Sequence, residues 1–459
     1  MPRRFRCTVC GYIHEGDAPP DCCPVCGVGA EMFEPYEDAP SAPMSTPSIP
    51  PTSPAIAPPR ETRAGPRLVI LGGGIAALSA AQAARATSPD GRITLVHRES
   101  TLPYDRMSLT RYLAGDVARE ALLVRNHEWF KEQGILLVQA EARSLDRAGR
   151  RVVLDDGQAL PYDRLLVATG AHPFVPPIPG VRRQGVHVLR TVDDAEAILR
   201  SVRKGARCVC IGGGLLGIET AGGLVRRGVT VTVLDEAPWL LSRQLARPAS
   251  ARLSGLLGEV GIAVVSAAKV AEIAGDESVR SVLLADGTEV PADMVVIAAG
   301  VRPNIAMARA AGLATNRGVL VDDSLRTNDP DVLAAGDVAE HRGVVWGLWT
   351  VALEQGKLAG AGLAGATISF AGNPPSTQLK VLAWPVFSVG RFEVESPSDK
   401  VVEYADKTRL SRIVVKDGVV VGGNLIGDAT LAGPLRRAVQ ERLALSTVPE
   451  LAALAQGRA

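Results

Sequence analysis

The stretch RLVILGGGIAA, residues 67–77, joins a short apolar strand to a glycine-rich turn and the start of an Ala-rich helix. The stretch CVCIGGGLLG, residues 208–217, repeats this order about 140 residues later. A glycine loop between a strand and a helix lets a phosphate approach the backbone, and the helix N-terminus offers free N–H groups. Two such units predict two Rossmann-like dinucleotide-binding folds, each a parallel sheet flanked by helices. The candidate loop positions are Gly72, Gly74 and Ala77 in the first unit and Gly212, Gly214 and Gly217 in the second.

A carboxylate follows the next predicted strand in each unit. Asp235 ends the strand that contains VTVL, and Glu99 follows ITLV at a similar distance from its glycine loop. Such an acid accepts hydrogen bonds from ribose hydroxyls. Asp235 would also repel the 2′-phosphate of NADP, so this unit favours NADH over NADPH. In the first unit Arg98 precedes Glu99, and the sequence leaves open which of these two side chains faces a ribose.

Four cysteines near the start form two C-x-x-C pairs separated by twelve residues, Cys7 with Cys10 and Cys23 with Cys26. Two residues between thiolates let one turn aim both sulfurs at a single metal ion. The two pairs therefore predict a closed four-thiolate site, and this ligand set suits either iron or zinc. Cys22 fits the spacing less well, and we interpret it as a bystander.

The composition excludes several classes of partner. A chain of 459 residues is long enough for two to four domains, and its net charge of +1 does not indicate a nucleic-acid or membrane-surface partner. No apolar run approaches the roughly 18 residues that span a bilayer, and MPRRFRC at the start lacks the apolar segment of a secretory signal. Thiolate ligands without a disulfide framework suit a reducing compartment, so we expect the protein in the cytoplasm. Cys208 and Cys210 lie two apart on one strand and are expected to pack in the core.

The chain divides at a proline-rich segment. Residues 39–64 contain eight prolines among 26 residues and show no periodicity, which predicts a linker partly stiffened toward polyproline II. Residues 1–38 would form a small metal domain before it. Beyond about residue 375 the pattern changes to alternating strands and a helix, which predicts a third, α+β domain at residues 376–459.

The sequence around the four cysteines is RCTVCGYIHEGDAPPDCCPVCGVGAEMFEPYED, residues 6–38. It resembles the short rubredoxin-like domain of rubrerythrins, with Phe5, Tyr12 and Phe33 as aromatic cover. The resemblance implies one iron ion in four cysteine thiolates, which passes single electrons. A structural zinc ribbon uses the same cysteine turns and stays open as the alternative.

Residues 66–459 resemble flavoprotein reductases with two dinucleotide folds, the family that includes NADH:rubredoxin oxidoreductases and the flavoprotein part of NADH-dependent nitrite reductases. The matching stretches are LPYDRMSLTRYLAG (102–115), PYDRLLVATGAHPFVPPIPG (161–180), GGGLLGIETAGGL (212–224), AAGVRPN (298–304) and VLAAGDVAE (332–340). The resemblance implies FAD in a first domain (65–187 and 301–375) and NADH in a second (188–300). Residues 376–459 resemble the interface domain of dimeric relatives, which leaves a homodimer open.

The resemblance also implies roles for single residues. It places the following around FAD: Gly72, Gly74, Ala77, Glu99, Arg106, Thr169, Gly170 and Asp337. It places the following around NADH: Gly212, Gly214, Gly217, Asp235 and Gly300. Glu219 would lie near the nicotinamide and the flavin ring, and Arg111 stands where related sequences have a lysine beside the flavin. As alternatives, Arg106 would be a surface arginine and Glu219 a first-turn acid that complements the helix dipole.

These features predict an NADH-dependent flavoprotein oxidoreductase. Electrons would pass from NADH through FAD to the iron centre, and then to an unidentified redox protein or small-molecule acceptor. No further cysteines are present for a sirohaem or iron–sulfur cluster, so we do not expect the chain itself to reduce nitrite. Two alternatives stay open. One is a redox-sensing or partner-recruiting flavoprotein with a zinc ribbon, and the other is the electron-input component of a nitrite- or peroxide-reducing system.

Overall fold

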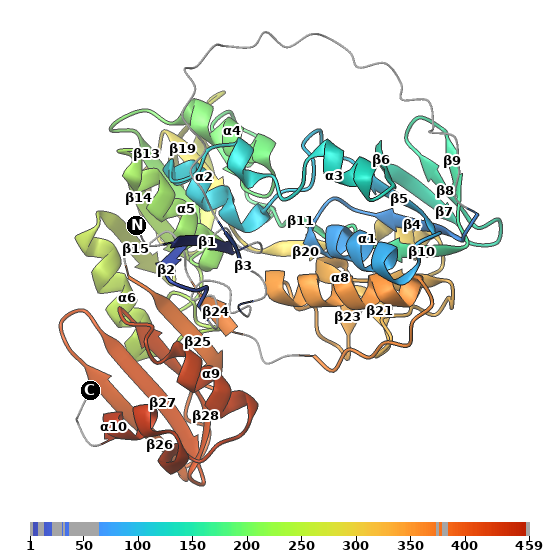
Figure 1. Cartoon of the computed structure of the whole chain (residues 1–459). Helices are drawn as coiled ribbons and strands as arrows, with labels where there is room; N and C mark the ends of the chain where they lie inside the picture. Colours follow the sequence, from blue (N-terminus) through green and yellow to red (C-terminus); the bar gives the residue numbers. More distant parts are fainter. Residues whose placement is uncertain are drawn as a thin grey trace.

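The computed structural model describes residues 3–7, 13–20, 30, 33–35, 64–372, 376–378 and 384–455. Figure 1 shows two α/β folds side by side and an α+β domain that lies against the second of them. Within these described ranges, no helix is both long and apolar enough to cross a membrane.

The first fold is built on a five-stranded parallel sheet in the order β22-β10-β4-β5-β6. Its strands are β4 (Arg67–Leu71), β5 (Arg92–His97), β6 (Ile135–Gln139), β10 (Arg164–Val167) and β22 (Val332–Ala334). The helices α1 (Ile75–Thr87) and α8 (Trp349–Leu363) cover one face (Figure 1). A second, three-stranded sheet covers the other face, with strands β7 (Ala142–Asp146), β8 (Arg151–Leu154) and β9 (Ala159–Pro161). Because both faces are covered, the central strands are continuous apolar runs.

The helices α1 and α8 meet along a seam of small residues. A Cβ atom at Gly356 would lie 2.4 Å from the carbonyl oxygen of Ala76, and one at Gly360 would lie 2.2 Å from that of Ala80. Only glycine allows backbones to approach this closely. The seam therefore fixes the start of α1, directly after the first glycine loop, against α8.

The second fold repeats the architecture with the strand order β12-β19-β13-β14-β15, all parallel. Its strands are β12 (Val186–Val188), β13 (Arg207–Ile211), β14 (Thr230–Asp235), β15 (Ile262–Ser266) and β19 (Met294–Ile297). One face is covered by α4 (Val192–Ser201), α5 (Leu215–Arg226) and α6 (Arg247–Glu259), and the other by the sheet of β16 (Val270–Gly275), β17 (Val279–Leu284) and β18 (Glu289–Pro291). Cys208 and Cys210 are fully buried under the helices, which confirms their predicted place in the core.

Two features join the folds. The short strands β11 (Ala171–Pro173) and β20 (Val301–Pro303) pair antiparallel where the chain leaves the first fold and returns to it. In addition, α2 (Leu109–Ala114) packs on α5, where a Cβ atom at Gly223 would lie 3.0 Å from the carbonyl oxygen of Thr110. This helix comes from the first part of the chain but shares the core of the second fold.

The C-terminal domain is a five-stranded antiparallel sheet in the order β24-β25-β28-β27-β26. Its strands are β24 (Ser376–Gln378), β25 (Val386–Gly390), β26 (Asp399–Ala405), β27 (Leu410–Lys416) and β28 (Val419–Ile426). Asp417 and Gly418, both at positive φ, form the tight turn between β27 and β28, as the twist of a hairpin requires. The helices α9 (Ala432–Gln440) and α10 (Pro449–Ala455) pack on one face, and the other face contributes Val386, Leu410 and Ile426 to the core of the second fold.

Near the N-terminus, β1 (Arg3–Cys7), β2 (Ile13–Gly16) and β3 (Phe33–Pro35) form a small antiparallel sheet in the order β2-β1-β3. The remaining helices and strands are α3 (His127–Glu132), α7 (Ala306–Ala310), β21 (Val319–Val321) and β23 (Ala339–His341). Short 3-10 turns occur at Arg106–Ser108, Glu120–Leu122, Gly336–Val338 and Leu445–Thr447.

Candidate functional site

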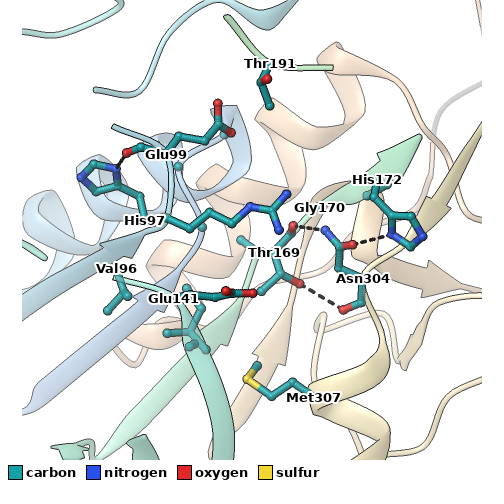
Figure 2. A pocket seen from close by; sticks show the side chains of 18 of the residues that line it. Val96, His97, Glu99, Glu141, Thr169, Gly170, His172, Thr191, Asn304 and Met307 are labelled. Carbon is teal, nitrogen blue, oxygen red and sulfur yellow. Dashed lines mark hydrogen bonds between the residues drawn. The ribbon is translucent and has the colours of Figure 1, made fainter. Parts of the chain in front are cut away.

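A pocket of about 540 Å³ lies at the carboxyl ends of β4, β5 and β10 (Figure 2). The crevice at the carboxyl ends of the strands is where open parallel sheets bind their ligands. The lining includes Gly72, Gly74, Glu99, Arg106, Thr169 and Gly170, all predicted from the sequence. Ala77 is buried in α1.

The first glycine loop has the geometry of a phosphate cradle. Gly72 has φ +140°, and a Cβ atom there would lie 2.1 Å from the carbonyl oxygen of Ala168, so only glycine fits. Gly74 is the N-cap residue of α1, and a Cβ atom there would meet nothing within 4 Å. The first amides of α1 therefore face open space beside the pocket, where a helix N-terminus favours an anion.

The carboxylate of Glu99, just beyond β5, is held by two side chains. Its Oε2 accepts a hydrogen bond of 2.7 Å from the Tyr104 hydroxyl, and its Oε1 lies 2.6 Å from Nη2 of Arg106. Burial raises the pKa of Tyr104, so this phenol stays a donor. Arg106 thus lies inside the pocket in an ion pair and not on the open surface.

Arg190 extends this network to Asp337 and was not identified from the sequence. It follows β12, and its carbonyl oxygen accepts a hydrogen bond from Nη1 of Arg106. Its guanidinium lies 2.8 Å from Oδ2 of Asp337, at the 3-10 turn that follows β22. Glu99 is therefore neutralised by Arg106, and Asp337 by Arg190. The hydrogen bond from the Arg106 side chain to the Arg190 carbonyl links the two pairs. This balance favours an anionic ligand, since two free carboxylates would repel it.

Asn304, in the segment after β20, is the second residue that sequence reasoning missed. Figure 2 shows it between Thr169 and His172. Its Nδ2 donates to the carbonyl of Thr169 at 2.7 Å, and the Thr169 hydroxyl donates to the carbonyl of Asn304 at 3.3 Å. Its Oδ1 lies 2.7 Å from Nδ1 of His172, which must carry the proton because the amide oxygen can only accept. The ends of β10 and β20 are thereby fixed together at the wall of the pocket.

Three buried donors in α8 and just before it have no partner within the described ranges. The indole Nε1 atoms of Trp346 and Trp349 and the Nε2 of Gln355 have no hydrogen-bond partner among the residues that the structure describes. The Oε1 of Gln355 accepts from the N–H of Gly336, the residue before Asp337. Buried donors are normally satisfied, and the acceptors of a ligand would satisfy these three, although their residues are not among those that line the pocket. Together with the glycine cradle they fit an extended dinucleotide such as FAD.

The second glycine loop has the same geometry as the first. Gly212 has φ +116°, and a Cβ atom there would lie 2.5 Å from the carbonyl oxygen of Ala298. A Cβ atom at Gly217 would lie 2.0 Å from the carbonyl oxygen of Gly212, while one at Gly214, the N-cap residue of α5, would meet nothing within 4 Å. Gly300 has φ +104° and open space at its Cβ position.

Asp235 lies over this second loop. A Cβ atom at Gly213 would be 2.4 Å from its Oδ2, and its Oδ1 accepts a hydrogen bond of 3.2 Å from the N–H of Ala237. Burial raises the pKa of the Asp235 carboxyl. The acid and the glycine loop are thus adjacent, as a site for the ribose and the pyrophosphate of one dinucleotide requires.

Glu219 and Arg111 lie at the junction of α5 and α2. The Thr110 hydroxyl donates a hydrogen bond of 3.0 Å to Oε2 of Glu219, and both side chains are buried. Glu219 therefore contacts Thr110, the residue before Arg111 on α2. Sequence reasoning did not identify this contact.

The predicted metal ligands Cys10, Cys23 and Cys26 lie outside the described residues, as does the side chain of Cys7. The four-thiolate site therefore stays a prediction from the sequence.

Comparisons with known proteins match three segments of the chain. The family model for pyridine nucleotide-disulphide oxidoreductases matches residues 66–356. The rubrerythrin rubredoxin-like domain matches residues 5–34, and the rubredoxin NAD+ reductase C-terminal domain matches residues 375–443.

Individual relatives agree with these segments. A nitrite reductase [NAD(P)H] of Bacillus subtilis (strain 168) is 34% identical over 79% of this chain and 46% of its own length. This chain thus spans about half the length of that relative. The solved NADH:rubredoxin oxidoreductase from Clostridium acetobutylicum has a TM-score of 0.73 at 28% identity and covers 85% of this chain and 99% of its own. A solved covalent putidaredoxin reductase–putidaredoxin complex has a TM-score of 0.77 at 28% identity. The match covers 86% of this chain and 99% of the other. The predicted resemblance and fold class are confirmed.

Proposed function

Because the chain belongs to the pyridine nucleotide-disulphide oxidoreductase family, we propose that it carries electrons from NADH through FAD to an iron ion in its own N-terminal domain, and then to an external acceptor. The predicted class of enzyme, a pyridine-nucleotide oxidoreductase, is confirmed by that membership. The NADH preference, the iron and the order of the carriers are the proposal.

One observation carries it: a single chain contains a rubredoxin-like segment, two dinucleotide folds and a rubredoxin-reductase C-terminal domain. Residues 39–64, predicted from the sequence to be a linker, would keep the carrier near its reductase, since a coil of 26 residues spans roughly 30 Å. Tethering of this kind gives effective concentrations on the order of millimolar. Residues 1–38 carry a net charge of −4 and the whole chain +1, so the remainder, at +5, attracts the carrier.

The first pocket supplies what FAD needs. The loop at Gly72 and Gly74 and the start of α1 would hold the pyrophosphate, and Asp337, positioned by Arg190, would accept hydrogen bonds from the ribityl chain. FAD bound here would supply the chemistry of accepting a hydride and passing on its two electrons singly. The Glu99–Arg106 ion pair neutralises two charges that would otherwise lie unpaired beside the cofactor.

The second fold supplies the NADH site. Gly212 and Gly214 would let the pyrophosphate approach α5, and Asp235 would accept hydrogen bonds from the adenosine ribose hydroxyls and repel a 2′-phosphate. Hydride transfer needs no general acid or base, so the protein contributes orientation. The contact of Thr110 with Glu219 holds α2 on α5, between the two folds.

The metal is inferred from the donor set. Four thiolates, Cys7, Cys10, Cys23 and Cys26, suit iron or zinc, and the rubredoxin-like match supports iron. We place the protein in the cytoplasm because a reducing compartment keeps these thiolates available.

An anaerobic NADH titration of the iron-loaded protein, followed by absorbance, tests the proposal. We expect the flavin band to bleach and the ferric-thiolate bands to disappear after it. The variant Cys23→Ser is the matched control, because its flavin should still bleach while the metal bands are absent. Metal bands that persist beside a fully bleached flavin would refute the internal transfer, and zinc in natively produced protein would support a partner-recruiting or redox-sensing role.

A second candidate follows from the similarity to nitrite reductases. The chain would then be the electron-input component of a system whose terminal protein reduces nitrite. Mixing the iron-loaded protein with NADH and a separately purified nitrite-reducing protein tests it. Nitrite loss that depends on both proteins is the expected result.

A further inference from the structure

Asn424, on β28 of the C-terminal domain, is fully buried and faces the second fold. Its Oδ1 accepts a hydrogen bond of 2.9 Å from the N–H of Ala246. Its Nδ2 donates to the carbonyl of Gln244 at 2.9 Å and to the hydroxyl of Ser388, on β25, at 3.0 Å. The Ser388 hydroxyl donates to the same Gln244 carbonyl. One amide thus binds two main-chain groups of a segment about 180 residues away in the sequence.

That segment, residues 236–246, runs from the end of β14 to α6. Ala246 is the N-cap residue of α6, and its side chain cannot act as a cap, so Asn424 satisfies a main-chain group at this helix end from another domain. Inside the segment, Leu241 is buried at φ +53°, and its carbonyl accepts from the N–H groups of Gln244 and Leu245. A non-glycine residue in this left-handed region is strained, so its surroundings must hold it there.

The same segment touches the second glycine loop. The N–H of Leu241 donates to the carbonyl of Gly213 at 3.3 Å. A Cβ atom at Gly213 would lie 2.4 Å from Cδ2 of Leu240 and 2.4 Å from Oδ2 of Asp235. The acid, the glycine loop and residues 236–246 are therefore in direct contact.

We infer that Asn424 is a positioning residue for the adenosine half of NADH, acting through residues 236–246. The inference rests on the proposed NADH site in the second fold and adds a role for the C-terminal domain in forming it. Val386 and Ile426 also attach this domain to the second fold, by apolar contacts. The buried Asn424 amide in addition fixes the position of residues 236–246. A shift of this segment would break its hydrogen bonds and leave buried polar groups unpaired, which costs free energy.

The variant Asn424→Leu tests the inference, because it keeps the volume and removes the hydrogen bonds. Calorimetry with NAD+, which needs no electron transfer, should show a dissociation constant raised about tenfold. In anaerobic stopped-flow reduction by NADH, the apparent dissociation constant should also rise about tenfold. The limiting rate should stay within about twofold of the wild type. Reduction by the mononucleotide NMNH, which lacks the adenosine, should be unchanged.

Leu435→Ala is the control, because Leu435 is buried between the same sheet and α9, on the face away from the second fold. It should lower the melting temperature without changing NAD+ affinity. The inference is overturned if Asn424→Leu binds NAD+ like the wild type, if Leu435→Ala loses as much affinity, or if NMNH reduction falls in parallel with NADH reduction.

One further variant and one wild-type control keep the test decisive. If Asn424→Leu does not fold, Ser388→Ala removes one bond to the Gln244 carbonyl and should weaken NAD+ binding about twofold to threefold, while unchanged affinity would count against the inference. A wild-type flavin that NADH does not reduce would refute the proposed function, whereas calorimetry with NAD+ would still decide the role of Asn424.

Discussion

The hydroxyl of Thr110 on α2 and the carboxylate of Glu219 on α5 are joined by a buried hydrogen bond of 3.0 Å, across the junction of the two dinucleotide folds. Near the other end of α2, Arg227 on the turn after α5 donates to the carbonyl of Leu113 at 2.8 Å. The two helices are thus held together at both ends of their contact.

The variant Thr110→Val should slow flavin reduction by NADH about fivefold, which corresponds to ~1 kcal/mol, because Glu219 loses a donor. Stopped-flow reduction at saturating NADH measures this effect. Thr110→Ser keeps the hydroxyl and should stay within about twofold of the wild type. If the valine variant is reduced as fast as the serine variant, the hydrogen bond does not contribute to the reaction.

Replacing Arg190 by Met should weaken FAD binding about tenfold, ~1.4 kcal/mol, because Asp337 then stands unneutralised in the cofactor site. Fluorescence of released FAD at equilibrium measures the affinity. Arg207→Met is the matched control, since Arg207 forms a similar 2.7 Å ion pair with Asp293 but both side chains are about half exposed and remote from the pocket. Equal FAD loss in both variants would contradict the role of Arg190.

Asp235→Arg should raise the ratio of kcat/KM for NADPH to that for NADH by at least about tenfold, because a guanidinium accepts the 2′-phosphate that a carboxylate repels. Steady-state kinetics with both nucleotides provide the ratio. Asp286→Arg makes the same charge change in an exposed turn and should leave the preference as it is. If the ratio for NADPH to NADH is unchanged in Asp235→Arg, other residues select between the two nucleotides.

The variant Gly356→Ala should destabilise the protein by about 2 kcal/mol, because its Cβ atom would lie 2.4 Å from a carbonyl oxygen of α1. Thermal unfolding measures the loss. Gly258→Ala lies in α6, where a Cβ atom meets nothing within 4 Å, and should stabilise by about 0.5 kcal/mol through its helix propensity. Two variants with the same melting temperature would show that α1 and α8 can separate without cost.

Asp323 predicts a pH dependence of stability. Hydrogen bonds from Arg342 and then His341 lower the pKa of Asp323 to about 2. A depressed carboxyl pKa stabilises the folded state above its unfolded value of about 3.8, and this contribution disappears as the pH falls toward 2. Asp323→Asn should therefore have a lower melting temperature than the wild type at pH 6. This difference in melting temperature should narrow between pH 4 and pH 2. A difference in melting temperature that does not change with pH would argue against an ionised Asp323 paired with Arg342.

Local pattern made the two glycine loops and the flanking strands predictable, because a strand, a glycine turn and a helix follow one another directly, and it made Asp235 predictable because this acid ends the next strand, about twenty residues after its loop. Arg190 and Asn424 could not be found in this way. Arg190 meets its partner Asp337 across 147 positions, and Asn424 meets Gln244 across 180, so only the folded chain brings them together. The contact of Thr110 with Glu219 depends on the packing of α2 on α5 and also has no local signal.

The pairing of β11 with β20 has a consequence for how such proteins diversify. The chain enters and leaves the second fold through two strands that lie side by side, so everything between them is an insertion with adjacent ends. Insertions of this kind can be exchanged with little effect on the host fold. Recombination at these two neighbouring points would replace most of the second fold as one block, and the new block would have to keep a residue that does what Arg190 does for Asp337 in the first pocket.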